Sequence, residues 1–322
     1  MIIINKIFVF ASLFFFLVII TPCVSANSRI FSISPLFGVK YGHADEIVFK
    51  FQGQDQYLSH LIWDLKPLVY VGFGAELAPS FGRSGFFTAF SLKYGLPRLR
   101  TGFIENRDWN DIRHNDLTHF SKHDAFSRGA FLADISAGYS WHLADSFSVN
   151  AFLEFSYKHL SWDGRDGFFQ YAEEIAPRQY GPWHDGIPKT RLFGRVISYS
   201  QNWFILSPGL SMRWNINRLF SLAGFISYSP LIFCIAKDTH WLRDITFYDY
   251  VRFGRHLKWG GVLVFTGARY HDFFLNFSHR RISGSRGDTR VVQGNAVSRY
   301  FDSAGAAYSA FDLGFGVKIR VR

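Results

Sequence analysis

Apolar and polar residues alternate with a period of two over long stretches of the chain. In the C-terminal segment 311–321, one face carries only bulky apolar side chains, while the other carries glycines and charges such as Lys318 and Arg320. The same pattern recurs over 147–158 and 251–265. Because successive side chains of a β-strand point to opposite faces, this period predicts strands with one apolar and one polar face. The first apolar set is Phe311, Leu313, Phe315, Val317, Ile319 and Val321; the third is Val251, Phe253, Leu257, Trp259, Leu263 and Phe265.

The longest uncharged stretch after the N-terminus, 219–236, is long enough to raise the question of a transmembrane helix. Small residues such as Ser221, Ala223 and Ser227 alternate with larger ones, and Pro230 interrupts the stretch. The period is therefore two rather than 3.6, and the segment is predicted to be a strand with one polar face.

Turn-forming residues divide the chain into long strands joined alternately by short and long connections. Because four short and five long connections imply ten strands, and short turns opposite long polar loops are typical of outer-membrane barrels, we predict an all-β fold. It is a ten-stranded antiparallel transmembrane β-barrel with long extracellular loops and short periplasmic turns, in one domain. Short connections are expected near 79–84, 144–146, 217–218 and 271–272, and long ones near Gly53 and over 109–125, 163–195, 241–249 and 283–305.

Composition and charge agree with this class. Aromatic residues make up 19% of the chain and the mean hydropathy is +0.03. This value is too polar for a bundle of membrane helices, whereas abundant Phe, Tyr and Trp suit strands and the aromatic girdles of a barrel. The formal net charge is +10, but no block of five or more basic residues occurs. We therefore expect no nucleic-acid partner, and instead an acidic lipid or sugar-phosphate surface.

Residues 1–26 are expected to be a secretory signal peptide. Lys6 precedes the apolar stretch 7–20, and small residues follow up to Ala26, after which cleavage is expected. The mature barrel domain would then be 27–322, exported and inserted into the outer membrane.

The two cysteines suggest no disulfide in the mature chain. A lipoprotein cut before Cys23 is an alternative to the signal peptide, but Val24 is an unfavourable neighbour for such a site. Cleavage after Ala26 removes Cys23 and leaves Cys234 without a partner, so Cys234 is expected to be a buried apolar residue rather than a nucleophile.

Two short motifs place ionisable side chains two residues apart, at the end of a strand before a long loop. The first is 106–111 and the second is 238–240. Asp238 and His240 would have Cα atoms roughly 6.6 Å apart, close enough for the carboxylate to orient the imidazole. This is the arrangement of general-base catalysis, although a hydrogen-bonded pair on a solvated loop remains the alternative.

Prolines in these two strands predict which way the motifs face. The apolar set is even-numbered before Pro230 and odd-numbered beyond it, and the same change occurs at Pro97. A proline inside a strand favours a bulge, and a bulge reverses the facing of the residues that follow. Both motifs are therefore expected to face one interior cleft. The residues expected to point inward are Arg98, Arg100, Asn106, Asp108, Asp238 and His240.

Common catalytic and metal-binding signatures are missing from the sequence. It contains no H-E-x-x-H, G-x-S-x-G, Walker loop or C-x-x-C motif. The loop 114–124 gathers three histidines and two aspartates, but their spacing is not specific, so we predict a solvated polar loop and no metal site. These residues are His114, Asp116, His119, His123 and Asp124.

Five motifs, in order along most of the mature chain, resemble those of the omptins, ten-stranded outer-membrane proteases of Gram-negative bacteria. Single motifs of this length are weak, but five in order at matching strand positions are fairly specific. They are G-x-x-x-G-x-x-x-E at Gly38, Gly42 and Glu46; S-x-L-x-W at Ser59, Leu61 and Trp63; a version of D-x-D-W-x-D at 106–111; S-x-H at 121–123; and D-x-H at 238–240.

The resemblance implies a catalytic site. In the omptins the D-x-H pair and two aspartates face each other across a water-filled cleft, and a water between the histidine and one aspartate attacks the peptide carbonyl. Carried over, His240 is the base, Asp238 its orienting partner and Asp108 the second aspartate. Asn106 replaces the first aspartate; its amide can hold a water but cannot accept a proton. The implied activity is that of an aspartic-type endopeptidase.

The resemblance also implies what the protein binds. The family prefers basic residues at the cut site because acids line the pocket; Glu46 matches one such acid, whereas Ala236 replaces another. Family members depend on lipopolysaccharide held by outward basic residues, and Arg165 resembles part of that site. The expected partners are peptide or protein substrates and an outer-membrane lipid as activator, with no other cofactor, and the barrel is expected to be a monomer.

A different class of function stays open. Since Asn106 removes a carboxylate, the protein could be a catalytically silent outer-membrane barrel that serves as an adhesin or binding protein. Its function would then reside in the segments 163–195 and 283–305, and His240 would be dispensable.

Overall fold

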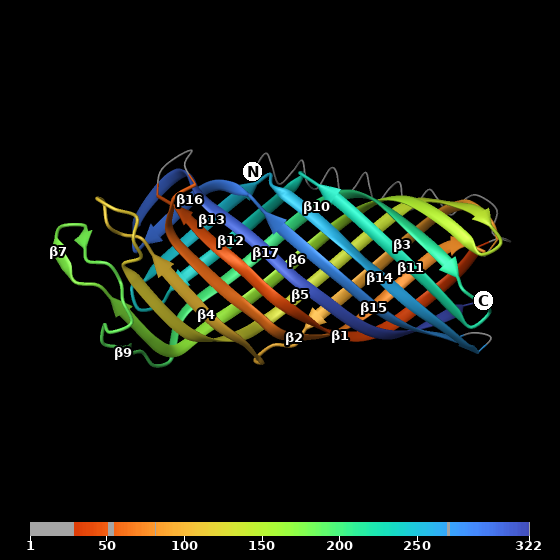
Figure 1. The fold of residues 1–322 in the computed structure, drawn as a ribbon, viewed down its shortest axis with the longest axis horizontal. Coiled ribbons are helices and arrows are strands. Elements are labelled where there is room, and N and C mark those ends of the chain that lie inside the picture. Colours follow the sequence, from red (N-terminus) through yellow and green to blue (C-terminus); the bar gives the residue numbers. More distant parts are fainter. Residues whose placement is uncertain (1–28, 51–54, 81, 269–270, 322) are drawn as a thin grey trace.

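The computed structural model describes residues 29–50, 55–80, 82–268 and 271–321. The expected signal peptide lies outside these residues. The described chain is almost entirely β-structure, and its long strands run diagonally around one barrel (Figure 1). The barrel strands are β1 (Arg29–Phe49), β2 (Tyr57–Pro79), β3 (Gly85–Gly95), β4 (Arg100–Asp108), β5 (His119–Ala144), β6 (Phe147–Tyr171), β10 (Arg195–Asn215), β11 (Phe220–Ser229), β12 (Ile232–His240), β13 (Ile245–Arg252), β14 (Arg255–Ala268), β15 (His271–Ser283), β16 (Arg286–Gln293) and β17 (Ala296–Val321).

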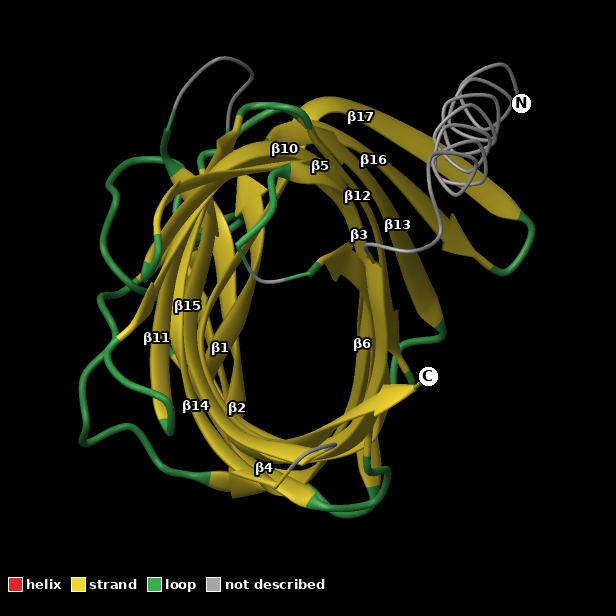
Figure 2. Ribbon diagram, turned by 90° about the vertical axis from the view of Figure 1, so that its right-hand side faces the viewer, coloured by secondary structure: helices red, strands yellow, loops and turns green. Residues whose placement is uncertain are grey.

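These segments form a closed ring of ten antiparallel strands, as predicted. Four ring strands are each broken once, so that β3 and β4, β11 and β12, β13 and β14, and β15 and β16 continue one another. The ring closes where β1 pairs with β17, from Phe31 opposite Val321 to Val48 opposite Ala304. Seen along its axis, the barrel has an oval rather than circular section (Figure 2). Where the described strands close the ring, closure removes the free edges of the sheet.

The connections differ at the two ends of the barrel. The turn end carries the short connections 80–84, 145–146 and 216–219, where the sequence predicts them. The loop end carries the longer 172–194, which contains the short strands β7 (Glu174–Ala176), β8 (Gln179–Tyr180) and β9 (Thr190–Arg191).

Two of the predicted long loops are wrong. The connection between β12 and β13 is only the four-residue turn 241–244, and 283–305 is a paired hairpin of β16 and β17 with a turn at 294–295. The strands extend past the apolar part of the barrel, where polar side chains occupy both faces. Polarity there reflects solvent on both sides of a strand rather than a loop.

An apolar belt surrounds the turn-end part of the barrel. On β17 the outward Phe311, Leu313 and Phe315 are each at least 40% exposed, whereas Asp312 between them is buried in the lumen. Lys318 and Arg320 face inward and pair with Glu76 and Asp272. The alternation predicted for this strand is confirmed. The described residues contain no helix long and apolar enough to cross a membrane.

Nearer the loop end, outward positions become charged. Glu105 on β4 pairs with Arg107 and with Lys122 of β5 on the outer surface. On β12, Lys237 is outward and exposed. The inward residues at this level therefore lie beyond the apolar belt.

The strand breaks reverse the facing of the side chains. On β11 the outward residues are even-numbered, with Tyr228 51% exposed, whereas on β12 the even-numbered Ile232 and Asp238 are buried inside. The break at Pro230 thus turns Asp238 inward, as predicted. On the third ring strand the change is completed at Gly102, where the register with β5 shifts and φ is 117°.

Two predicted orientations are wrong. Arg100 is not inward; it is half-exposed, pairs with Asp124 and lies over the ring of outward Phe103, because the register shift follows it. Val251 is not outward but fully buried, because a break at Phe253–Gly254 reverses the facing between β13 and β14. No proline marks this break, and apolar residues continue to alternate through it, so the sequence pattern does not show that the facing reverses there.

Aromatic residues from opposite sides of the ring meet in the lumen. The Trp63 ring stacks on Tyr199 with centroids 5.0 Å apart and lies 6.0 Å from Trp162. Gln201 donates a 2.9 Å hydrogen bond to the carbonyl of Asp45 on β1, which joins β10 to the other wall. These side chains form a floor across the barrel. Cys234 is buried and unpaired in this core, as expected.

Candidate active site

Asp238 and His240, at the loop-end tip of β12, form a hydrogen-bonded pair inside the barrel mouth. His240 Nε2 lies 2.6 Å from Asp238 Oδ2, and the ring packs edge-on against Phe247 with centroids 5.5 Å apart. Asp238 is 1% exposed. The second ring nitrogen, Nδ1, accepts a hydrogen bond of 2.5 Å from Arg243 Nη2. With Nε2 held by a carboxylate, Nδ1 is the nitrogen that faces the cleft.

Asn106 and Asp108 lie on the opposite wall, on β4. Ser59 of β2 donates hydrogen bonds of 2.6 Å to Asp108 Oδ1 and 3.1 Å to Asn106 Oδ1. The Asn106 amide in turn donates to Asp108 Oδ2 at 3.2 Å. Both carboxylate oxygens of Asp108 are therefore engaged by neutral donors.

The two walls interact electrostatically across the cleft. Withdrawal from solvent raises the pKa of Asp108; the hydrogen bonds from Ser59 and Asn106, and then the charges of Arg243 and His240, oppose this rise. Hence the two motifs that the sequence separates by more than a hundred residues share one site.

A second group of acids lies behind Asp238. Glu46 of β1 and Asp249 of β13 are 3% and 4% exposed. Burial, and then the charges of Asp238 and Asp249, raises the pKa of Glu46 well above its ordinary range. Burial also raises the pKa of Asp249 to about 7, against a 2.7 Å hydrogen bond from Thr289. The three carboxyls thus form one buried acidic group at the cleft.

This acidic group is under-satisfied. Glu46 Oε2 and Asp238 Oδ1 are buried and have no hydrogen bond of good geometry within the described residues; Trp63 is the neutral group that interacts with Glu46, and Asp238 the acidic one. No lysine or arginine of the described chain forms an ion pair with Glu46 or Asp249. Buried carboxylates without a partner are costly, so the group is suited to a cation that enters from outside.

Asp249 was not among the sequence-derived candidates. It is directly opposite Ala236 in the register of β12 and β13. The dipeptide Phe253–Gly254 is the sequence signal for this residue. If the strand is broken there, the facing of β13 is opposite to that of β14, and Asp249 points inward together with Val251. A carboxylate is therefore present beside Ala236, but on the neighbouring strand.

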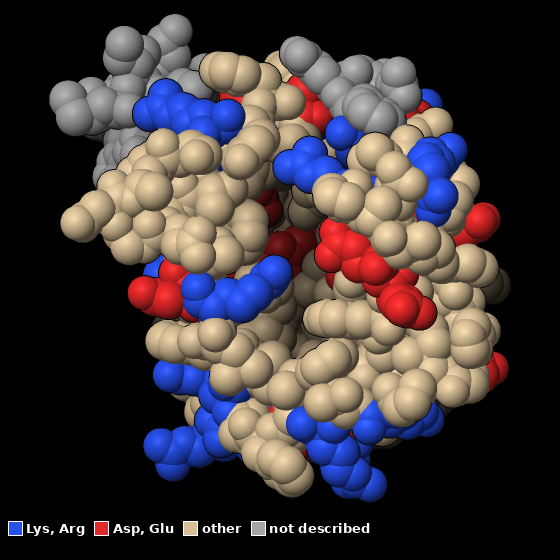
Figure 3. Space-filling view, turned by 90° about the vertical axis from the view of Figure 1, so that its left-hand side faces the viewer, with Lys and Arg blue, Asp and Glu red and all other residues tan. Residues whose placement is uncertain are grey.

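The loop-end surface shows the cleft directly. In the space-filling view of that end, a hollow opens, acidic side chains line its depth, and both basic and acidic side chains lie around its rim (Figure 3). The interior of the opening is therefore negative, whereas its rim carries charges of both signs.

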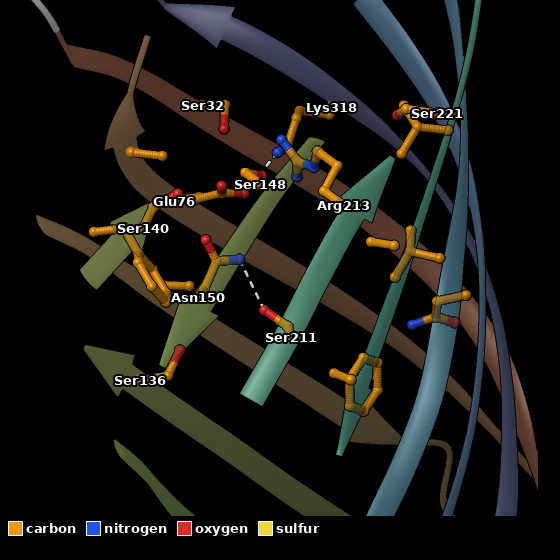
Figure 4. Close-up of a pocket in the computed structure, with 18 of the residues that line it drawn as sticks. Ser32, Glu76, Ser136, Ser140, Ser148, Asn150, Ser211, Arg213, Ser221 and Lys318 are labelled. Carbon is orange, nitrogen blue, oxygen red and sulfur yellow. Dashed lines mark hydrogen bonds and ion pairs between the residues drawn. The ribbon is translucent and has the colours of Figure 1, made fainter. Parts of the chain in front are cut away.

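The turn-end half of the lumen holds a cavity of about 1010 Å³. It is lined by serines and by cation–carboxylate pairs such as Lys318 with Glu76, and the Asn150 amide bonds Ser211 at 2.8 Å (Figure 4). None of the sequence-predicted site residues lines it.

Arg165 lies outside the barrel, away from the cleft. It is half-exposed and pairs with Asp163 at 3.2 Å, and Arg128 approaches the same carboxylate at 3.7 Å. Arg195 is next to it in the strand register and lies 3.7 Å above the Trp241 ring. Three arginines and one acid give this outer surface a positive charge.

The histidines of 114–124 do not converge. His114 pairs with Asp111 and Asp116, His119 packs on Tyr171, and His123 contacts Ser121. Across the described residues, no three His, Cys, Asp or Glu side chains are placed to hold a metal ion.

Comparisons with known proteins agree with this architecture. A family profile described as "Omptin family" matches residues 27–321. A comparison with curated proteins found no match. Among solved structures, the outer membrane protease OmpT from Escherichia coli is similar, with a TM-score of 0.82, 17% identity, and coverage of 94% of this chain and 100% of that chain. The translocator domain of the autotransporter NalP from Neisseria meningitidis gives a TM-score of 0.41 at 10% identity, covering 93% and 90% of the two chains.

Proposed function

Because the chain belongs to the omptin family, we propose that it is an endopeptidase that uses His240 to activate a water molecule and cuts peptides beside basic residues. It is an outer-membrane β-barrel with an omptin fold. The observation that carries the proposal is the meeting of the Asp238–His240 pair with Asn106 and Asp108 across one acid-lined cleft.

The proposed reaction starts at Nδ1 of His240, because Asp238 occupies Nε2. Nδ1 accepts a proton from water while the water oxygen bonds to the peptide carbonyl carbon. Asp238 holds the ring in orientation and stabilises the imidazolium that forms. Asn106 positions the water by hydrogen bonding, and Asp108, across the cleft, is the remaining carboxylate that favours the charged ring.

The acidic group supplies the proposed substrate preference. A basic side chain that enters beside Glu46 and Asp249 would supply the cation that this part of the barrel lacks. Arginine suits the position best, because its planar fork of donors can serve two carboxylates at once. Asp249 then compensates for Ala236.

An anionic lipid is the proposed activator. The outer surface around Arg165, Arg128 and Arg195 carries more positive than negative charge beside an aromatic ring, which suits the phosphates and acyl region of lipopolysaccharide. We also propose that residues 1–26 are removed on export, so that N-terminal sequencing of the mature protein would begin at Asn27.

The test is cleavage of two peptides by refolded mature protein with lipopolysaccharide, one with arginine at the scissile bond and one with glutamine. The wild type should cut the arginine peptide, and His240→Ala should lower the rate by roughly 100- to 10,000-fold while the barrel still folds. The control is His60→Ala, which removes a histidine paired with Asp45, away from the cleft. Full turnover by His240→Ala would refute His240 as the base, and an inert wild type would favour a silent binding barrel.

A further inference from the structure

Arg243 lies directly on the base of the proposed site. It is the third residue of the turn 241–244, and its backbone N–H donates to the carbonyl of His240 at 3.2 Å, which folds the turn back over β12. Its guanidinium then donates to Nδ1 of His240 at 2.5 Å. A water cannot use Nδ1 as an acceptor while this hydrogen bond exists.

The turn that carries Arg243 is held from the outer side. The Trp241 N–H donates to the carbonyl of Val196 at 3.0 Å, and its indole donates to Ser198 Oγ at 2.8 Å. Arg195 covers the face of the same indole. The backbone of the turn is thus anchored, and only the long Arg243 side chain is free to change its partner.

Arg243 has donors to spare and no carboxylate partner. Within the described residues it forms no ion pair, and one of its five N–H groups accounts for the contact with His240. Its positive charge acts on Asp108 and Tyr171 across the cleft, where it opposes the rise in pKa that burial causes. Asp108 is already engaged by Ser59 and Asn106, so it does not draw the guanidinium away.

The position between the base and the opposite wall is where a scissile carbonyl must lie for a water on Nδ1 to attack it. A carbonyl oxygen there is a better acceptor for a guanidinium once it becomes an oxyanion, because the hydrogen bond is then charge-assisted. Neutral Nδ1 is a weaker partner than that oxyanion.

We propose that Arg243 is a catalytic residue: it covers Nδ1 in the resting protein, transfers its hydrogen bond to the scissile carbonyl when a peptide binds, and so both frees the base and stabilises the oxyanion. This inference rests on the proposed peptidase function. The water oxygen bonds to carbon as its proton moves to Nδ1 and the carbonyl π electrons move to oxygen. Collapse breaks the C–N bond, and the proton on Nδ1 passes to the leaving amine, which restores neutral His240.

The experiment compares wild type, Arg243→Ala and Arg243→Lys on the arginine peptide, with Arg299→Ala as the control for an exposed loop-end arginine. Arg243→Ala should lower kcat by roughly 100- to 1,000-fold with KM changed only severalfold, as when one oxyanion donor is removed. Arg243→Lys should retain part of the rate because the charge survives, and Arg299→Ala should match wild type.

A second measurement examines the resting contact without turnover. In ¹⁵N spectra of histidine-labelled protein, with the His240 signal identified by its loss in His240→Ala, Arg243→Ala should shift the Nδ1 resonance. An unshifted resonance would overturn the proposal, as would a kcat for Arg243→Ala equal to or above wild type. An inert wild type would overturn the peptidase function together with this inference, whereas an active wild type with an equally active Arg243→Ala would overturn this inference alone.

Discussion

The two halves of the barrel lumen bury acidic side chains in opposite ways. In the turn-end half, carboxylates pair with cations across the cavity: Asp312 contacts Lys40 and Lys93, and Glu154 contacts Lys258 and Arg280. At the loop end, Glu46 and Asp249 are equally buried, but no described lysine or arginine pairs with them.

The difference separates groups that hold the barrel together from groups that await a ligand. The attraction within each ion pair offsets the cost of removing its two charges from water. These pairs therefore hold neighbouring strands together and offer no unpaired charge to a ligand. Buried carboxyls without a cation instead hold their protons more tightly, and a cation that enters favours their charged form. The turn-end cavity is therefore the structural half of the lumen, and the loop-end cleft, with its unpaired carboxyls, is the proposed site.

The largest effect is expected when one partner of an ion pair in the turn-end half is removed. Asp312→Asn should destabilise the barrel by about 3–5 kcal/mol, because Lys40 and Lys93 would be left as buried cations without a carboxylate. The measurement is urea unfolding followed by the heat-modifiable shift on gels. Cleavage per folded molecule should not change.

The matched control in the same cavity is Ser211→Ala, which loses only the hydrogen bond to Asn150 and should cost about 1 kcal/mol. Equal stability of Asp312→Asn and Ser211→Ala would mean that the turn-end pairs do not hold the barrel together.

Removing a charge from the cleft should have the opposite consequence. Asp249→Asn should lower kcat/KM for an arginine peptide by about 10- to 100-fold, since a buried carboxylate–arginine contact is lost, and should raise the stability of the free protein. The glutamine peptide is the internal control, and its kcat/KM should change little. Unchanged discrimination between the two peptides would show that Asp249 does not contact the substrate.

The next variant adds a carboxylate on β4, across the cleft from His240, and should raise activity. Asn106→Asp should raise kcat by roughly tenfold, because a second acid beside Asp108 favours the imidazolium formed during attack. Steady-state cleavage in the presence of lipopolysaccharide measures this. Asn106→Ala, which adds no charge, should show no increase in kcat. If the kcat of Asn106→Asp equals that of wild type, the missing acid does not limit the rate.

The smallest expected effect is on pH dependence. Since the pKa of Asp249 is raised to about 7, the folded protein holds this proton where an unfolded aspartate has lost it. Stability should therefore fall as pH rises from about 4 to about 7, and KM for the arginine peptide should fall severalfold from pH 6 to pH 8 as the carboxylate forms. Asp249→Asn should flatten the KM profile; an unaltered profile would assign the titration to another group.

Much of the architecture could be predicted because strand facing is a local property. Alternation on β17 identified the outward belt and the inward Lys318 and Arg320, and Pro230 marked the break that turns Asp238 and His240 inward. The order of the short motifs identified the family. The same local signals are ambiguous in two places: polar strands beyond the belt have the composition of loops, and the break at Phe253–Gly254 has no proline to mark it.

The sequence by itself determined that the chain forms ten two-faced strands and that two motifs of ionisable residues end inside them, because both follow from side-chain alternation along single segments. Only the tertiary structure decided which of those residues meet. Closing the ring brings Glu46 of the first strand beside Asp238 and Asp249, and a turn of four residues folds Arg243 onto His240. These contacts depend on strand register and on the section of the closed barrel, which no single segment encodes.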